Sequence, residues 1–137
     1  KDGSGAEETE AISTARAEVV RLINAGELAP AAKAYRALAD RFGDKPGAVT
    51  LSRRYQYDLA NYLYSQSRFA DAAYAYERFL DAYPKDSESP QIRLLLGIIA
   101  ARELNDPVRA KALITEAEPL LDGEAKDRAR AELANLG

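Results

Sequence analysis

The fold is decided by the stretch LANYLYSQSRFADAAYAYERFLDAYP, residues 59–84, which contains two apolar helical patterns with almost no connection between them. In each half, apolar residues recur every three or four positions, which is typical of an amphipathic helix. Small Ala60 and Ala72 allow two antiparallel helices to approach closely, and larger apolar residues fill the space around that contact. Pro84 then ends the second helix, because proline cannot continue it. The stretch therefore predicts one tightly packed helix pair.

This helix pair resembles a tetratricopeptide repeat, because its apolar and small residues stand at the spacings that define that family. The residues at those spacings are Leu59, Ala60, Leu63, Phe69, Ala72, Tyr76 and Pro84. The resemblance implies a superhelix of stacked antiparallel helix pairs, in which the first helix of each pair lines a concave groove. In such arrays the groove receives extended peptides or helices of partner proteins.

Two further units repeat the pattern at irregular spacing. Residues 26–42 align without a gap on residues 67–83, which is a lag of 41 residues. The third unit keeps Leu96 and Gly97 at the corresponding places, with a lag of 37 to 38 residues. A regular repeat of the family has a period of about 34 residues, so the array is degenerate.

We predict an all-α fold, an α-α superhelix of three tetratricopeptide-like helix pairs and a C-terminal capping helix, with about seven helices and no strand. Residues 1–6 are rich in glycine and lack apolar periodicity, so we predict a flexible lead-in there. Residues 7–137 are predicted to form a single domain. Its parts are repeats over 7–43, 48–84 and 88–121 and a cap over 122–137.

Polar residues at the expected helix starts predict caps. Ser67 stands before the expected fourth helix. Ser89 and Asp106 each precede a proline, which tolerates the first helical position because no donor is needed there. The third helix is expected to begin at about Ala48.

The composition excludes several classes of function. The chain has neither histidine nor cysteine, so histidine-based catalysis, thiol nucleophiles, disulfides and the common zinc sites are excluded. Acidic residues fall at helix ends and on polar faces, where solvation explains them, and the glycines form no phosphate loop. We therefore predict no enzyme, no metal and no cofactor.

Charge and hydropathy exclude some kinds of binding partner. Nineteen basic and 22 acidic residues give a net charge of −3, mixed along the chain, so we expect no nucleic acid as partner. The longest uncharged apolar run, residues 94–101, is far shorter than the roughly 20 residues that cross a bilayer, so we expect no direct membrane insertion by this segment. The chain begins at Lys1 and lacks methionine, so an upstream signal peptide or membrane anchor is possible. The sequence does not decide the compartment.

One stripe of the expected third helix predicts a recognition surface. Arg54, Tyr57, Asn61 and Tyr64 follow 3-4-3 spacing on the side opposite Leu59, and the resemblance places this stripe in the groove. The corresponding candidates are Ser13, Arg16, Val20 and Ile23 in the first unit and Gln91, Leu94, Ile98 and Ala101 in the third. Tyrosines offer flat apolar area, Asn61 could pair with a peptide backbone, and the arginines could hold an acidic group.

Other interpretations stay open for the same residues. Tyrosines at helical spacing also pack between helices, and Arg54 is also explained as a solvated side chain. The expected fifth helix is apolar on nearly every side. Either its neighbouring helices enclose it, or Leu94 and Ile98 are covered by a partner or by a second copy of the chain.

We expect a non-catalytic scaffold that binds a protein or peptide partner in the groove. One alternative is a structural domain that forms homo-oligomers through Leu94 and Ile98. Another is the accessory part of a larger bacterial membrane-associated protein.

Overall fold

The computed structural model describes residues 2–137, with side chains throughout that range except at 2–4 and 46. Over this range the chain forms seven α-helices and no strand, so the predicted all-α fold is confirmed. The helices are α1 (Asp2–Asn24), α2 (Leu28–Phe42), α3 (Arg53–Ser65), α4 (Phe69–Ala82), α5 (Ser89–Arg102), α6 (Pro107–Ala117) and α7 (Gly123–Leu136). Two short 3₁₀ turns, η1 (Pro46–Ala48) and η2 (Glu118–Leu120), follow α2 and α6.

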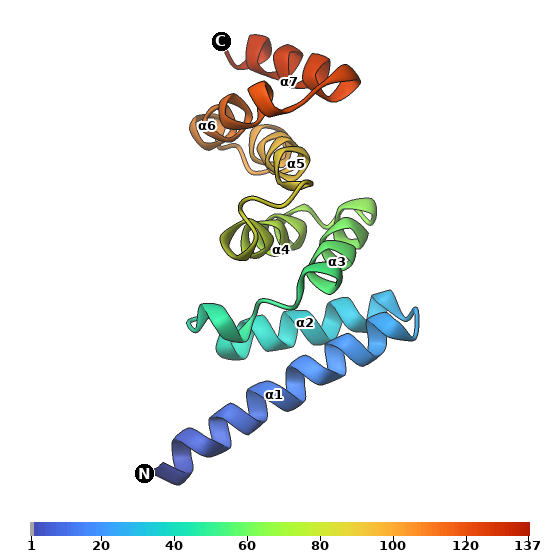
Figure 1. Ribbon diagram of the computed structural model, residues 1–137, viewed down its shortest axis with the longest axis vertical. Helices are drawn as coiled ribbons and strands as arrows, with labels where there is room; N and C mark the ends of the chain where they lie inside the picture. The colour runs from blue at the N-terminus through green and yellow to red at the C-terminus, as the bar shows by residue number, and fades with distance from the viewer. Residues whose placement is uncertain (1) are drawn as a thin grey trace.

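The helices stack in chain order along one axis, with the two termini at opposite ends (Figure 1). Consecutive helices form antiparallel pairs, α1 with α2, α3 with α4 and α5 with α6, and each pair packs against the next. α7 covers the end of the stack, against α5 and α6. A single pair leaves part of its apolar surface open, so stacking of neighbouring pairs is what completes the core.

The middle pair packs as the sequence predicts. Ala60 of α3 and Ala72 of α4 are fully buried, and so are the larger side chains of Leu59, Tyr76 and Phe79 around them. Burial of each large apolar side chain stabilises the fold by roughly 1.5–3 kcal/mol. One core extends from α1 to α5, and a second, smaller cluster joins α5, α6 and α7. The cap therefore has a core of its own.

The connection between α2 and α3 explains why the first repeat is long. Five successive backbone carbonyls, those of residues 47–51, accept hydrogen bonds from side chains. The Arg16 guanidinium of α1 donates to three of them over 2.5–3.0 Å. The Tyr35 hydroxyl of α2 donates to a fourth over 2.7 Å, and the Tyr83 hydroxyl donates to the fifth over 3.1 Å. Side chains thus satisfy backbone groups that a helix would satisfy internally.

Gln56 on α3 ties this connection to the helix pairs on both sides of it. Its side chain is fully buried. Its amide nitrogen donates to the Tyr35 hydroxyl over 3.1 Å and to the Ala75 carbonyl over 2.9 Å. Its Oε1 accepts from the backbone N–H of Leu51 over 2.9 Å. Because an unpaired buried polar group costs about 1–3 kcal/mol, this set of bonds fixes the first pair against the second.

Helix α1 begins early in the chain. It starts at Asp2, within the residues 1–6 predicted as a flexible lead-in, and Lys1 lies outside the described residues. Ala6 is a strong helix former, and the acidic side chains that follow it are stabilising near a helix N-terminus. Residues 5–10 are all exposed, and the Glu8 carboxylate lies 3.7 Å from the Lys45 ammonium group of the connection after α2.

The start of α3 differs from the predicted one. The helix begins at Arg53 and not near Ala48. The side chains that hold the carbonyls of residues 47–51 keep this segment in a non-helical conformation after η1, and that network is not visible in the local sequence pattern.

Candidate functional site

The stripe predicted on the third helix is present as a row of side chains on α3, and we call Arg54, Tyr57, Asn61 and Tyr64 the α3 row. Arg54 is exposed, with 70% of its side-chain surface accessible, and the other three are half-buried. The row is therefore open to solvent at Arg54 and only partly accessible at its other three side chains.

Asn61 is held in one orientation by a buried tyrosine. The Tyr76 hydroxyl donates to Asn61 Oδ1 over 2.6 Å. Burial raises the pKa of Tyr76 well above its usual value, with a further contribution from Tyr57 and Tyr64, so the hydroxyl keeps its proton and acts as the donor. With Oδ1 occupied, the Asn61 Nδ2 group is the part of the amide that has no acceptor among the described residues.

The two tyrosines of the α3 row pack partly between helices, as the alternative interpretation predicted. The Tyr57 ring lies 5.9 Å from the Phe79 ring, and the Tyr57 hydroxyl donates to Glu88 Oε1 over 3.3 Å. The Tyr64 ring meets the Phe69 ring edge-on at 5.8 Å. Both rings are therefore preorganised, with only part of each surface left for a ligand.

Arg54 makes a loose surface ion pair with Asp58 one helical turn away, with Nε and Oδ2 3.8 Å apart. Its guanidinium also lies 5.4 Å from the centre of the Tyr55 ring. Exposed pairs of this kind contribute between about 0 and 1 kcal/mol, so Arg54 is available to other anionic groups at little cost.

A shallow cleft of about 400 Å³ lies beside Asn61, and we call it the Asn61 cleft. It separates α3 from the turn between α1 and α2. Its lining residues are Ile23, Gly26, Leu28, Asp58, Asn61, Tyr62 and Ser65. Gly26 makes the turn with a φ of 77°, a conformation that favours glycine. Asp58 is the one charged residue of the lining, and the cleft combines apolar area with an acidic group and an amide.

The first unit does not extend the row as predicted. Arg16 is committed to the connection between α2 and α3, where its guanidinium donates to three carbonyls. Val20 is half-buried against the main core. Ile23, two turns after Arg16, is the residue of α1 that reaches the Asn61 cleft.

The third unit contradicts the prediction for Leu94 and Ile98. Their accessible fractions are 0% and 4%, and they belong to the cluster under the cap. Residues of α6 and α7 cover them, among them Ile114 and Ala129. Enclosure by neighbouring helices was the other interpretation of this apolar helix, and it is confirmed. Leu94 and Ile98 are therefore not groove residues, and they offer no surface for self-association.

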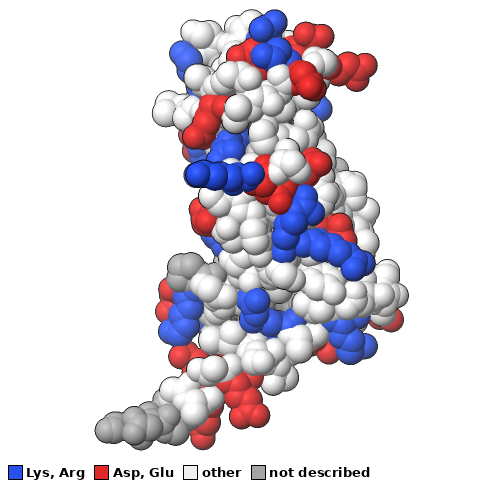
Figure 2. All heavy atoms as spheres, in the orientation of Figure 1, with Lys and Arg blue, Asp and Glu red and all other residues white. Residues whose placement is uncertain are grey.

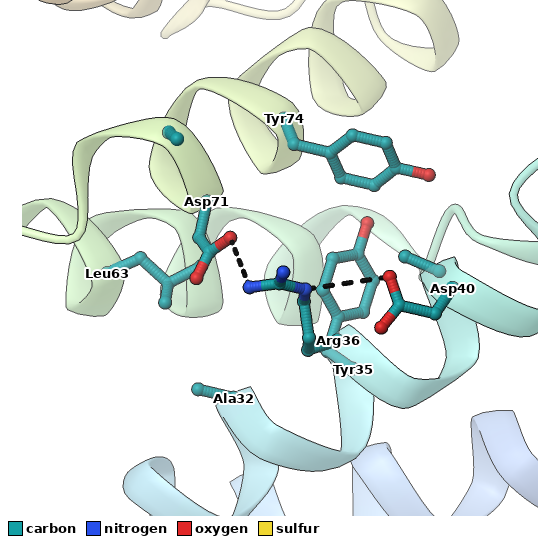
Figure 3. A pocket seen from close by; sticks show the side chains of 9 residues that line it. Ala32, Tyr35, Arg36, Asp40, Leu63, Asp71 and Tyr74 are labelled. Atoms are coloured by element: carbon teal, nitrogen blue, oxygen red, sulfur yellow. Dashed lines mark hydrogen bonds and ion pairs between the residues drawn. The ribbon is translucent and has the colours of Figure 1, made fainter.

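A second cleft, which sequence reasoning did not find, lies between α2 and α4 (Figure 3). We call it the α2–α4 cleft; its volume is about 220 Å³. Its lining residues are Ala32, Tyr35, Arg36, Ala39, Asp40, Leu63, Ala70, Asp71 and Tyr74. Ala32 and Ala39 repeat at two helical turns on α2, but small residues carry little signal in a chain so rich in alanine.

Charge on the surface is mixed. On the face shown in Figure 2, acidic and basic side chains are interspersed from one end of the stack to the other, and no broad area carries one sign. Within the described part of the chain, no three histidine, cysteine, aspartate or glutamate side chains gather in a group able to hold a metal ion. None of the described helices has the length and apolar character needed to span a membrane.

The chain belongs to the tetratricopeptide repeat family. The family model described as tetratricopeptide repeat matches residues 16–87 and 57–136, so the predicted resemblance is confirmed. Two solved structures share the fold. PcrH from Pseudomonas aeruginosa is 18% identical, with a TM-score of 0.52 over 93% of this chain and 92% of that chain. The type III secretion translocator chaperone SycD from Yersinia enterocolitica is 12% identical. Its TM-score is 0.54, over 93% of this chain and 84% of that chain.

No curated protein matches the chain. At these identities the two structures establish the fold alone. Family and fold together support a protein–protein interaction module with protein partners.

Proposed function

We propose that this chain is a non-catalytic module that binds a segment of a partner protein along the α3 row and in the Asn61 cleft. The observation that carries the proposal is the oriented amide of Asn61. Tyr76 fixes its Oδ1, and the Nδ2 donors are left to a ligand at the edge of a cleft. A backbone carbonyl of a bound peptide is the acceptor that such a donor recognises without regard to sequence.

The surroundings of Asn61 favour a segment with both apolar and basic character. Ile23 and Leu28 offer apolar surface in the cleft, and Asp58 is its one charged lining group. The half-buried rings of Tyr57 and Tyr64 add flat contact area at low entropic cost, because packing already holds them. SycD is a translocator chaperone of type III secretion, which supports a protein as the partner.

Asn61→Asp is the sharpest test of this site. Aspartate keeps an oxygen to accept from the Tyr76 hydroxyl and removes both amide donors, so the fold is retained while the contact to the ligand is lost. A photo-crosslinking residue at position 64, introduced in cells that express the protein naturally, would identify the partner. We expect Asn61→Asp to raise the Kd for the purified partner about tenfold, as measured by calorimetry. This corresponds to a loss of roughly 1.4 kcal/mol of binding free energy.

Two controls make this result specific. Asn135→Asp places the same change on an exposed position of α7 and should leave the affinity unchanged. A crosslinking residue at the exposed Ala131 of α7 should not capture the same partner. The proposal fails if capture from position 131 equals capture from position 64, or if the partner binds Asn61→Asp as tightly as the wild type.

A further inference from the structure

We infer that the α2–α4 cleft is a second docking site, which takes one aromatic side chain bearing an N–H or O–H donor, a tryptophan or tyrosine of a partner protein. This site involves the second helices of the first two pairs. It is separate from the Asn61 cleft, and no residue lines both.

The shape of the cleft fits an anchor side chain. Three alanines, Ala32, Ala39 and Ala70, leave space between the two helices because their side chains are short. The rings of Tyr35 and Tyr74 form an aromatic wall, with centroids 6.2 Å apart at 60°. A volume of about 220 Å³ is below the roughly 300–1,000 Å³ typical of small-molecule pockets. The cleft therefore suits one bulky side chain and not a length of main chain.

The charges at the mouth favour a neutral donor. Figure 3 shows the Arg36 guanidinium between the carboxylates of Asp40 and Asp71, with the Tyr35 ring beside it. The Arg36–Asp71 and Arg36–Asp40 contacts are 3.3 and 3.5 Å, longer than strong charge-assisted hydrogen bonds of about 2.7–2.9 Å. Asp71 has a second, closer partner in Arg68 at 2.8 Å. Asp40 has no other ion pair among the described residues and is left as the open acceptor.

An aromatic side chain with a donor could interact with both the apolar and the charged groups of the cleft. Its ring would pack on the alanines and against the tyrosine rings, its polar hydrogen would reach Asp40, and the Arg36 guanidinium could stack on its face. A lysine or arginine would find the same carboxylate but would place its charge next to Arg36. An aliphatic side chain would offer no hydrogen bond to Asp40.

The wall also contains a buried polar atom. The Tyr74 hydroxyl lies beside the Arg78 guanidinium, which interacts with it and lies 4.7 Å from the centre of its ring. In Figure 3 this hydroxyl lies toward the Asp40 side of the cleft.

The test is a titration of the ¹⁵N-labelled protein with N-acetyltryptophanamide, followed by amide chemical shifts. We expect saturable shifts confined to α2, α4 and the part of α3 around Leu63, with a Kd on the order of 1 mM, or roughly −4 kcal/mol. N-acetylleucinamide and N-acetyllysinamide should bind at least several-fold more weakly. Ala70→Leu fills the exposed mouth of the cleft and should reduce the affinity at least tenfold.

Two more variants keep the test decisive. Asp40→Asn, at an exposed position, should reduce the preference for the tryptophan amide over the leucine amide. Ala131→Leu makes the same enlargement as Ala70→Leu on exposed α7 and should leave binding unchanged. Shifts away from α2, α4 and the surroundings of Leu63, tighter binding of the lysine amide, or unaltered binding to Ala70→Leu would each overturn the inference.

Discussion

The side-chain amide of Gln56 donates to the hydroxyl of Tyr35 over 3.1 Å inside the core, and so joins the second helix pair to the first. Gln56→Leu keeps the volume but removes this bond and leaves the Leu51 N–H and the Ala75 carbonyl without their partner. We expect the free energy of unfolding to fall by about 2–4 kcal/mol in urea titrations. Gln66→Leu, at an exposed position, is the matched control and should change it little.

The same Tyr35 predicts a loss of stability at alkaline pH. Burial raises the pKa of Tyr35 from 10.0 to about 12, against a smaller opposing effect of the Gln56 bond. The unfolded chain therefore releases this proton at lower pH than the folded one, and the stability that the neutral phenol contributes is present below pH 10. It is lost between pH 10 and about 12, at about 1.4 kcal/mol per pH unit.

Tyr35→Phe isolates this contribution, because phenylalanine cannot titrate. Stability measured across the alkaline range should fall less steeply with pH in the variant than in the wild type, although its stability at neutral pH is lower. Tyr76, whose pKa is also raised by burial, continues to contribute in both proteins. Identical pH slopes in the two proteins would show that Tyr35 does not titrate differently in the folded state.

Gly97 marks the closest approach of α5 and α6. A Cβ added to it would lie 2.5 Å from Ile114 Cγ1 and 3.3 Å from the Ala110 carbonyl oxygen. Gly97→Ala should therefore lower the melting temperature, because overpacking costs typically about 1–3 kcal/mol and exceeds the helix-propensity gain of at most about 1 kcal/mol. Gly5→Ala, with no atom within 4 Å of the added carbon, should not lower it. An increase in melting temperature for Gly97→Ala would contradict the geometry.

An ion pair between α5 and α7 adds to the apolar contacts that hold the cap. Glu132 is buried at 5% accessibility and is bonded to Arg102 of α5. Arg102→Ala leaves that carboxylate buried without its cation, so we expect amide hydrogen exchange in α7 to become about tenfold faster. Arg130→Ala removes an exposed partner of Glu118 and should have a much smaller effect. Equal exchange in the two variants would place the stability of α7 in its apolar contacts alone.

Helix pairing could be predicted from the sequence, because it depends on apolar residues that recur at helical spacing in consecutive segments. The stripe of Ala60, Ala72 and their large neighbours is visible in the order of residues, and the structure confirms how they pack. Asp106 likewise caps α6 as predicted, since its Oδ1 accepts from the backbone N–H of Arg109 over 3.2 Å.

Two other predicted caps are wrong because tertiary geometry uses those residues differently. Ser67 has a φ of 58° and forms the left-handed residue of the turn between α3 and α4, a role usually left to glycine or asparagine. Ser89 donates to the carbonyl of Tyr83 and does not cap α5 with its side chain. Local preference for a cap could not show that the carbonyl of Tyr83, 6 residues earlier, needed a donor.

The candidate site was only partly predictable for the same reason. Asn61 could be named from its position, but the bond from Tyr76 that orients it joins residues on two helices. Leu94 and Ile98 were assigned to the groove because a pattern copied from the middle unit cannot register that α7 covers the last one. Whether the α3 row binds a partner stays a prediction.

The segment between α2 and α3 has one more consequence. Its five successive carbonyls are held by the side chains of Arg16, Tyr35 and Tyr83 and not by neighbouring backbone. The angle between the first two pairs is thus encoded in a few replaceable side chains, while the helices themselves need not change. In an array of this kind, evolution could adjust the curvature of the whole stack by point substitution at such a joint, without inserting or deleting a residue.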